Sequence, residues 1–540
     1  MLKLYVSNAC NMAKAIKNRA SKKAYVSHRQ LTFVNFESPF TRHLPKTNRW
    51  VELAASIPWD DIIGVYRKQL NNFSTGASNI NPRVAIGALM VKHLLNTSDR
   101  DTITAIEENI YIQHFLGFDN IIFEEPFNAS LFVEIRKRMG LENVEKVNDL
   151  IYTHSLLQIK KAADSKNKTK DDVDGGSKSE NDVPSSSTTS MPAPESGKEV
   201  ITHSGKLLID ATACPQNIAY PTDLKLLNTC REVTEKLIDK LYEPFLHGDT
   251  KPRTYREQAR HRYLLISKKK VRRRKELRKA LGQQLRYVRR NLGTIDKLLS
   301  YYEKFPLKVR DAQYLETIRK IYAQQLEMYN GRTHRVTDRI VSLYQPYVRP
   351  IVRGKERANV EFGSKINVSL INGYSFIDRL SWDAFNEGSY LMESIDKYKI
   401  RHGYYPASVS VDRIYCTREN RRQLKELGID LIGRQLGRPP KSGKLKLDPG
   451  ERNPIEGKFG QGKTRYGLGL IKARLQGTSE SWVSMIILVM NLVRMGAKSS
   501  LLFFVVLIER IADVIEQTFS ENEAGGRVGY PPENRFLVTY

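Results

Sequence analysis

The sequence has few cysteines and no grouping of them that suggests a metal or disulfide site. Only four occur among 540 residues, and they lie far apart, with no C-x-x-C pair and no histidine cluster nearby. Zinc sites and disulfide frameworks both need cysteines at close, repeated spacings. We therefore expect ordinary reduced thiols at Cys10, Cys214, Cys230 and Cys416.

The chain also lacks an uninterrupted apolar stretch of membrane-spanning length. Its most apolar segment, SWVSMIILVMNLVRMGAKSSLLFFVVLIERIADVI, is broken by Asn491, Arg494 and Lys498, whereas a spanning helix needs about 20 consecutive apolar residues. Residues 1–36 carry seven Lys and Arg and no acid, but they lack the apolar core of a secretory signal. These features predict buried helices or an oligomer face, no membrane association and a basic N-terminal arm.

One short motif lacks the context that its usual function needs. GKFGQGKT, residues 457–464, matches the phosphate-binding pattern G-x-x-x-x-G-K-[ST]. A P-loop also needs a buried strand before the glycines and a later strand that ends in an aspartate for Mg²⁺. The preceding GRPPKSGKLKLDPGERNPIE is instead rich in proline, glycine and charge. The sequence therefore argues against a nucleotide hydrolase.

Positive charge is in excess, and it is concentrated in one part of the chain. The 87 Lys and Arg against 59 Asp and Glu give a net charge of +28, and residues 251–340 hold 26 basic and 8 acidic side chains. This excess predicts a polyanionic partner, with nucleic acid as the natural candidate. A solvated helical surface is the alternative, because runs of charge on helices often have no partner.

Helical patterns dominate residues 48–160. Pro82 stands at the first position of NPRVAIGALMVKHLL, and Ser98 or Asp99 can cap DTITAIEENIYIQHFLGF. In PFNASLFVEIRKRMG, apolar residues recur along one face beside a basic triplet, Arg136 to Arg138. A DNA-binding bundle and a bundle with a solvated basic face are both compatible with this pattern.

The second half of the chain predicts an α/β fold with a mixed sheet. Strand patterns occur in GKLLID, VEFGSKINVSLI, YSFIDRLSW, ASVSVD and DLIG, and helical patterns in DAFNEGSYLMESIDKYKIRHG and TRENRRQLKELGI. Asp383 is expected near the start of the first helix, whereas Thr417 and Gly428 are expected to bound the second.

Changes in composition divide the chain into six parts. The segment before the first strand has almost no apolar residues and cannot repay the entropy of ordering. We expect a basic arm at 1–47, a helical DNA-binding domain at 48–160, a disordered linker at 161–203, an α/β core at 204–224 and 351–517, a basic helical insertion at 225–350 and a tail at 518–540.

Three isolated carboxylates have a chemical rationale as a set. Asp210 and Asp412 each end a short apolar pattern, LLID and VSVD, and Glu456 lies among six basic residues. Singly, an aspartate at a strand end is usually a turn or cap residue, and Glu456 can pair with Arg452 one helical turn earlier. Together they are the oxygen ligands with which two Mg²⁺ ions cut or transfer a phosphodiester.

The stretches around these carboxylates resemble the DD-E transposases of bacterial insertion sequences. LIDATACP, VSVDRIYCTRENRRQLKELGI and RNPIEGKFGQGKTRYGLGLIKARL look like the three boxes that carry the catalytic acids of that family. One branch has a Y-x2-R-x3-E-x6-K signature, and Arg452, Glu456 and Lys463 stand at its spacings, whereas Pro449 replaces the tyrosine. The N-terminal bundle and VRPIVRGKERANVEFGSKINVSL also resemble this group.

The resemblance implies an RNase H-like core and a DNA transposase. In this family the first Asp lies on the first strand, the second Asp on the fourth, and the Glu on a following helix. Water attacks the DNA strand first, and the released 3′-hydroxyl then attacks target DNA. The implied residues are Asp210, Asp412 and Glu456 as catalytic ligands of two Mg²⁺ ions, which Mn²⁺ can replace, and Arg452, Lys458, Lys463 and Arg465 as DNA contacts.

The same resemblance implies partners and a location. The partners are double-stranded DNA, as terminal inverted repeats and as target, and further copies of the chain in a dimeric or larger synaptic complex. The location is the bacterial cytoplasm, at the nucleoid. Two alternatives stay open: a non-catalytic DNA-binding regulator or domesticated transposase, and an RNase H-like nuclease without strand transfer.

Overall fold

The structure is a computed structural model that describes residues 43–70, 80–171, 202–352, 360–433 and 449–497. Most of the predicted basic arm and linker, the C-terminal tail and Cys10 lie outside these ranges. In the described part Cys214, Cys230 and Cys416 are buried and form no disulfide.

The N-terminal part is a bundle of helices whose starts follow the sequence signals. Asn81 caps one helix with Pro82 in its first turn, and Ser98 caps the next. Asn109 accepts two backbone N–H groups and separates α6 from α7, so the single helix predicted there is two. The helices are α3 (Arg49–Ser56), α4 (Trp59–Arg67), α5 (Pro82–Leu95), α6 (Asp99–Glu108), α7 (Ile110–Leu116) and α8 (Leu131–Asp171).

Two features of this bundle differ from the sequence-based predictions. Helix α8 includes residues 161–171, which composition places in the linker; lysine and alanine extend a helix that has already started. Arg136 is 3% exposed, and its guanidinium donates to both carboxylate oxygens of Asp99 at 3.0 and 2.6 Å. It is therefore part of the fold and not of a basic surface, because an acid from a neighbouring helix neutralises it.

The core is a mixed sheet, which confirms the predicted α/β class. Its order is β2-β3-β1-β5-β6, and β4 also pairs with β3. Strand β1 is antiparallel to β3 and parallel to β5, and β5 is parallel to β6. The strands are β1 (Lys206–Pro215), β2 (Arg349–Val352), β3 (Val360–Ile371), β4 (Tyr374–Ser381), β5 (Ser408–Val411) and β6 (Asp430–Ile432).

Two elements of the core begin or end elsewhere than predicted. Strand β1 continues five residues beyond Asp210, because its second half pairs with β3. The helix expected near Asp383 begins at Leu391, since Asn386 caps a short 3₁₀ turn before it. The remaining elements are η1 (Glu387–Tyr390), α14 (Leu391–His402), η2 (Arg413–Tyr415), α15 (Arg418–Glu426), η3 (Pro449–Arg452) and α16 (Asn453–Arg465). Thr417 caps α15 as predicted.

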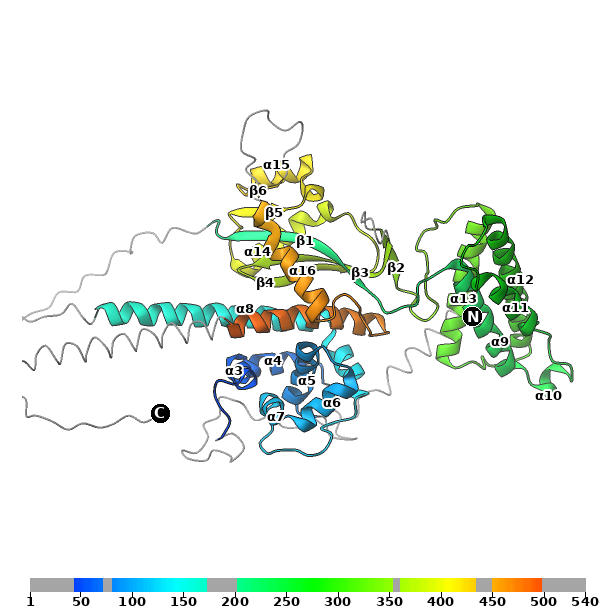
Figure 1. Ribbon diagram of the computed structural model, residues 1–540, viewed down its shortest axis with the longest axis horizontal. Coiled ribbons are helices and arrows are strands. Elements are labelled where there is room, and N and C mark those ends of the chain that lie inside the picture. Colours follow the sequence, from blue (N-terminus) through cyan, green and yellow to red (C-terminus); the bar gives the residue numbers. More distant parts are fainter. Residues whose placement is uncertain (1–42, 71–79, 172–201, 353–359, 434–448, 498–540) are drawn as a thin grey trace, which may run out of the picture.

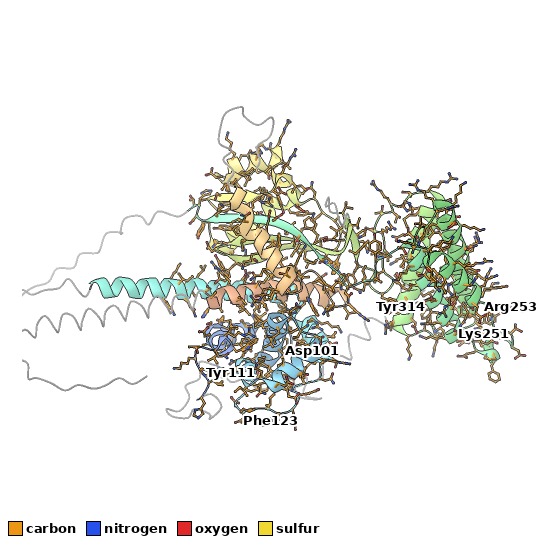
Figure 2. All side chains as sticks on the ribbon, viewed as in Figure 1. Asp101, Tyr111, Phe123, Lys251, Arg253 and Tyr314 are labelled. Atoms are coloured by element: carbon orange, nitrogen blue, oxygen red, sulfur yellow. The ribbon has the colours of Figure 1, made fainter. Side chains whose placement is uncertain are left out.

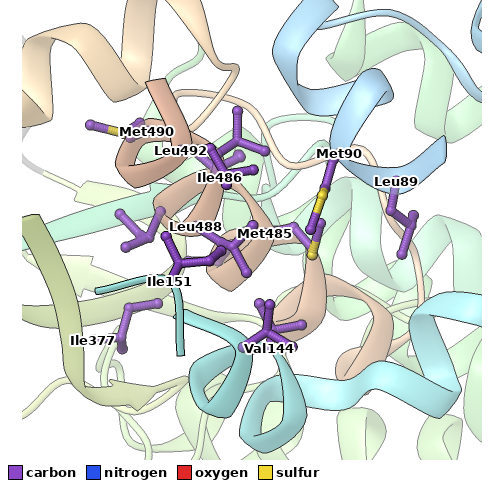
Figure 3. Close-up of a cluster of buried hydrophobic side chains, with 14 of the residues drawn as sticks. Leu89, Met90, Val144, Ile151, Ile377, Met485, Ile486, Leu488, Met490 and Leu492 are labelled. Carbon is purple, nitrogen blue, oxygen red and sulfur yellow. The ribbon is translucent and has the colours of Figure 1, made fainter. Parts of the chain in front are cut away.

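One buried apolar cluster joins the N-terminal bundle to the sheet. At its centre is the helix Gln476–Ala497, which lies beside α8 between the N-terminal helices and the sheet (Figure 1). Figure 3 shows Met485 and Leu488 of this helix among side chains of α5, α8 and β4. Within the described ranges this helix is long and apolar enough to cross a bilayer, but 72% of its most apolar stretch is buried in the protein. The prediction of a buried helix is confirmed for these residues.

A polar contact fixes the register of this apolar helix. Asn491 is fully buried, and its amide donates to Asn148 Oδ1 of α8 at 2.8 Å and to the Ser375 carbonyl of β4 at 2.7 Å. Its carbonyl oxygen accepts the Ser375 N–H at 2.8 Å. The residue that interrupts the apolar run therefore connects the bundle, the last helix and the sheet.

The segment between β1 and β2 forms a separate helical bundle with its own apolar core (Figure 1). The bundle begins with α9 at Asp223 and ends before β2, which begins at Arg349, two residues before the predicted boundary. Its helices are α9 (Asp223–Leu241), α10 (Pro244–His247), α11 (Arg256–Ser267), α12 (Arg274–Leu299) and α13 (Val309–Asn330).

We expect Asn491→Leu to lower the free energy of unfolding by about 1–3 kcal/mol, because it leaves buried groups of Asn148 and Ser375 without partners. Urea unfolding measures the change. Gln476→Leu, an exposed site on the same helix, is the control and should stay within about 0.5 kcal/mol of wild type. Equal effects of the two substitutions would contradict the role given to Asn491.

A second prediction concerns Glu145 of α8. Burial, with Asp149 and Asp378 nearby, raises its pKa to about 7 against the opposing charges of Lys397 and Arg401. A raised carboxyl pKa means that the folded state binds the proton more tightly, so stability falls as pH rises from about 4.5 to 7. Glu145→Gln should gain stability over wild type across that window, on the order of 1–3 kcal/mol, whereas Glu142→Gln at an exposed site of α8 should not. Unfolding measured between pH 4.5 and 8 tests this.

Candidate active site

The parallel register of β1 and β5 brings two of the predicted carboxylates together. Leu208 pairs with Ser410 and Ile209 with Val411, so the next residues, Asp210 and Asp412, follow at the same level of adjacent strands. Asp210 continues within β1 opposite Val368 of β3, whereas β5 ends before Asp412. The site therefore lies where β5 stops and β1 continues.

A buried aromatic residue holds the turn that carries Asp412. The side chain of Asp412 accepts the N–H of Arg413 at 2.6 Å and caps η2. Three residues on, the fully buried Tyr415 donates its hydroxyl to Asn367 Oδ1 of β3 at 2.5 Å. Asp412 thus acts as the turn cap that the simpler interpretation proposed, and it also presents its carboxylate to the site.

Glu456 comes from the first turn of α16, where the positive end of the helix dipole favours its charge. Ile455 is buried, and a side chain added at Gly462 would lie only 3.2–3.3 Å from Leu468 and Met490. These contacts place α16 against the core. The residues of GKFGQGKT are all helical, so no glycine loop exists, and the rejection of a P-loop is confirmed.

Arg452 joins the three carboxylates. Its Nη2 lies 2.8 Å from Asp210 Oδ2 and 4.0 Å from Glu456 Oε1, and its Nη1 lies 3.2 Å from Asp412 Oδ1. The Arg452 and Asp210 side chains are 21% and 15% exposed, whereas those of Asp412 and Glu456 are 53% and 61% exposed. Acids from β1, from the end of β5 and from α16 therefore converge on one guanidinium with one open side.

The buried member of the set is electrostatically strained. Burial raises the pKa of Asp210 against the lowering effect of Arg452 and of its hydrogen bond with the Ala211 N–H, and the charges of Glu387 and Asp412 raise it further. Glu387 is itself paired with Lys365 at 2.7 Å. A second positive charge near the carboxylates would relieve this strain.

The donor set has the chemistry that Mg²⁺ prefers, since hard divalent ions take carboxylate oxygens together with water and phosphate. As the side chains stand, no group of three or more acids, histidines or cysteines in the described ranges is arranged to hold a metal ion, and the Arg452 guanidinium lies within 4.0 Å of an oxygen of each carboxylate. The chemistry of the donor set would suit a metal ion if Arg452 lay away from the carboxylates. Those that could hold it are Asp210, Asp412 and Glu456.

The predicted DNA contacts of α16 lie on different faces of the helix. Lys463 follows Glu456 by seven residues, about two turns, and shares its face. A side chain added at Gly457 or Gly460 would meet nothing within 4 Å, so this face is open. Lys458 is half-buried with its pKa lowered by burial and by Arg494, and Arg465 lies over the Tyr466 ring at 5.6 Å. The last two lie apart from the carboxylates, and their DNA contacts stay predictions.

Sequence reasoning missed two features of this site. It paired Arg452 with Glu456 alone, because a helical spacing cannot show contacts with two distant strands. It also gave no role to Glu387, which the 3₁₀ turn η1 brings close enough to affect Asp210. No pattern around Glu387 distinguishes it from an ordinary surface acid, so the sequence held no signal for it.

Two segments of the chain match known protein families. Residues 409–493 match the family model of a transposase DDE domain, and residues 38–138 match that of a transposase domain of the family DUF772. The first match includes Asp412 and Glu456. It supports the predicted DDE-type transposase domain, a domain of an enzyme family of the nuclease and transposase kind. Together the two matches support an insertion-sequence transposase.

Other comparisons are less informative. An uncharacterized protein, ORF8 of the nfe locus of Rhizobium meliloti, is 26% identical over 179 residues, which are 33% of this chain and 66% of that protein. The chain thus spans slightly less than two thirds of this relative. No solved structure matches.

Proposed function

We propose that the chain is a DNA transposase that binds the ends of a mobile element and catalyses Mg²⁺-dependent strand cleavage and strand transfer. The convergence of Asp210, Asp412 and Glu456 on one cation carries the proposal, because the transposase resemblance implies these three acids as a set independently of their positions in space. The two family matches support it from separate parts of the chain.

We further propose that the core is RNase H-like. The strand order β4-β3-β1-β5-β6, with β1 and β3 antiparallel and β1, β5 and β6 parallel, supports this. If the short β2, which pairs only with the start of β3, is left out, Asp210 lies on the first strand and Asp412 after the fourth. Glu456 then lies on a following helix, as in the family that the sequence resembles.

The three carboxylates differ in position and in exposure. Asp210 is held within a central strand, so it sets the position of the site, whereas Asp412 and Glu456 face solvent, from which DNA would approach. When bound, Mg²⁺ supplies an attacking water of lowered pKa and neutralises charge on the leaving oxygen. Lys463 and the open face at Gly457 and Gly460 would receive the DNA backbone beside Glu456.

The insertion is proposed as a second DNA-binding surface. Residues 268–275, KKKVRRRK, contain seven basic side chains and are all exposed between α11 and the start of α12. Lys251 and Arg253 lie on the side of the same bundle away from the sheet (Figure 2). Some of this charge is already paired, since Lys251 contacts Asp239 at 2.7 Å and Lys269 contacts Glu276 at 2.9 Å. The partners proposed are duplex DNA and further copies of the chain, at the bacterial nucleoid.

Replacing the carboxylates tests the catalytic assignment. Asp210→Asn, Asp412→Asn and Glu456→Gln should each lower Mg²⁺-dependent nicking of a plasmid that carries the element ends by about a hundredfold or more, since each removes a charged oxygen ligand. DNA affinity, measured by gel shift, should not fall. Glu419→Gln on the exposed α15 is the matched control. Unaltered cleavage in all three variants would refute the assignment of these catalytic residues. DNA binding without any cleavage by wild type would favour the non-catalytic regulator, and cleavage without joined products would favour a simple nuclease.

Neutralising the insertion tests its interaction with DNA. We expect the joint change of Lys268, Lys270, Arg273 and Arg274 to Gln to weaken duplex binding, because these side chains would no longer neutralise phosphates. The slope of log K against log salt should become shallower by about 0.9 for each phosphate that the variant leaves unneutralised.

The control for this experiment removes the same charge elsewhere on the bundle. Lys297 lies in the last turn of α12, Lys304 and Lys308 follow that helix, and Lys320 lies within α13; all four are exposed. Helix α12 is about 35–40 Å long, so the first three lie far from residues 268–275. The salt slope of this variant should stay close to that of wild type. Equal slopes in all three proteins would refute a DNA surface at residues 268–275.

A further inference from the structure

Arg452 occupies the position that a metal ion would need. Its two terminal nitrogens lie within 4.0 Å of oxygens of all three carboxylates, Asp210, Asp412 and Glu456. The arrangement places three negative charges around one guanidinium. In the protein without DNA or metal, the positive charge of Arg452 therefore neutralises only part of the negative charge of the three carboxylates.

The guanidinium and a divalent ion compete for the same oxygens. Mg²⁺ binds carboxylate oxygens at about 2.0–2.1 Å, whereas Arg452 Nη2 lies 2.8 Å from Asp210 Oδ2. Two cations at these distances from one oxygen would repel each other strongly in a half-buried site. Binding of the metal thus requires Arg452 to leave, and the metal must bring enough free energy to replace its contacts.

A DNA phosphate is a suitable new partner for the displaced side chain. Guanidinium groups bind phosphate through two parallel N–H bonds. Arg452 is 21% exposed, lies at the start of α16 on the open side of the site, and has a buried Nε without a hydrogen-bond partner. A short movement toward solvent would exchange carboxylates for phosphate without moving the backbone of β1 or β5.

We propose that Arg452 couples metal binding to DNA binding: it closes the carboxylate site in the free protein and yields it when a DNA phosphate takes the guanidinium. The proposal rests on the proposed function, since it concerns the same three carboxylates. Coupling of this kind is reciprocal, so DNA should raise metal affinity by the factor by which metal raises DNA affinity. Its consequence is that the protein without DNA binds little metal, and that the metal site forms only when the protein is bound to DNA.

Metal titration of the full chain tests this without any measurement of activity. Mn²⁺ affinity is measured by electron paramagnetic resonance, first with Mn²⁺ alone and then with a duplex of about four helical turns taken from the end of the element. We expect wild type to bind Mn²⁺ about 5–150-fold more tightly with DNA than without it. Arg452→Gln should bind Mn²⁺ more than about fivefold more tightly than wild type without DNA, and DNA should change its affinity less than about twofold.

Two further variants keep the test decisive. Arg452→Lys keeps the charge but not the planar fork, so its metal affinity without DNA should exceed that of wild type, and this comparison holds even if Arg452→Gln unfolds. Arg413→Gln removes an exposed charge next to Asp412 and should behave like wild type. Equal Mn²⁺ affinities in wild type, Arg452→Gln and Arg452→Lys, with no effect of DNA, would overturn the coupling.

A triple variant separates this failure from failure of the proposed function. Asp210→Asn, Asp412→Asn and Glu456→Gln together should abolish the Mn²⁺ binding seen in Arg452→Gln. If this binding persists in the triple variant, or if no variant binds Mn²⁺ with or without DNA, the proposed function is wrong and the coupling falls with it. If the triple variant loses binding but Arg452 variants match wild type, only the coupling is wrong.

Discussion

The site depends on one constraint of the sheet: strands β1 and β5 run parallel in a register that places Asp210 and Asp412 side by side. Two like charges at this position, one of them largely buried, are unfavourable without a cation. Helix α16 and the residue that precedes it supply both the cation, Arg452, and a third acid, Glu456, from positions one turn apart. The position of α16 is therefore set by electrostatics at its start as well as by apolar packing along its length.

The long apolar helix Gln476–Ala497 connects the elements that surround this arrangement. It packs against α8 and the sheet in one continuous core. The hydrogen bonds of Asn491 fix its register against both. The N-terminal bundle and the sheet are thus a single structural unit. The insertion has its own core, so the DNA-binding surface proposed there is separate from the packing around the carboxylates.

Local sequence signals predicted the elements well where a single residue type decides the backbone. Asn81 with Pro82, Ser98 and Thr417 each begin a helix through a side-chain cap, and alternating apolar residues located β3 and β4. Prediction was poorer where residues distant in the sequence determine how far an element extends or whether a side chain is buried. Strand β1 passes Asp210 because β3 pairs with it, and Arg136 is buried because Asp99 of another helix neutralises it.

The sequence alone determined the class of fold, the position of the basic insertion and the three acids worth considering, because composition, periodicity and short motifs are local properties. It also excluded the nucleotide site at residues 457–464, where no strand could precede the glycines. Only the tertiary structure decided that these acids meet and that one guanidinium lies among them. Those facts depend on strand register and helix placement, which arise from contacts between residues more than two hundred positions apart.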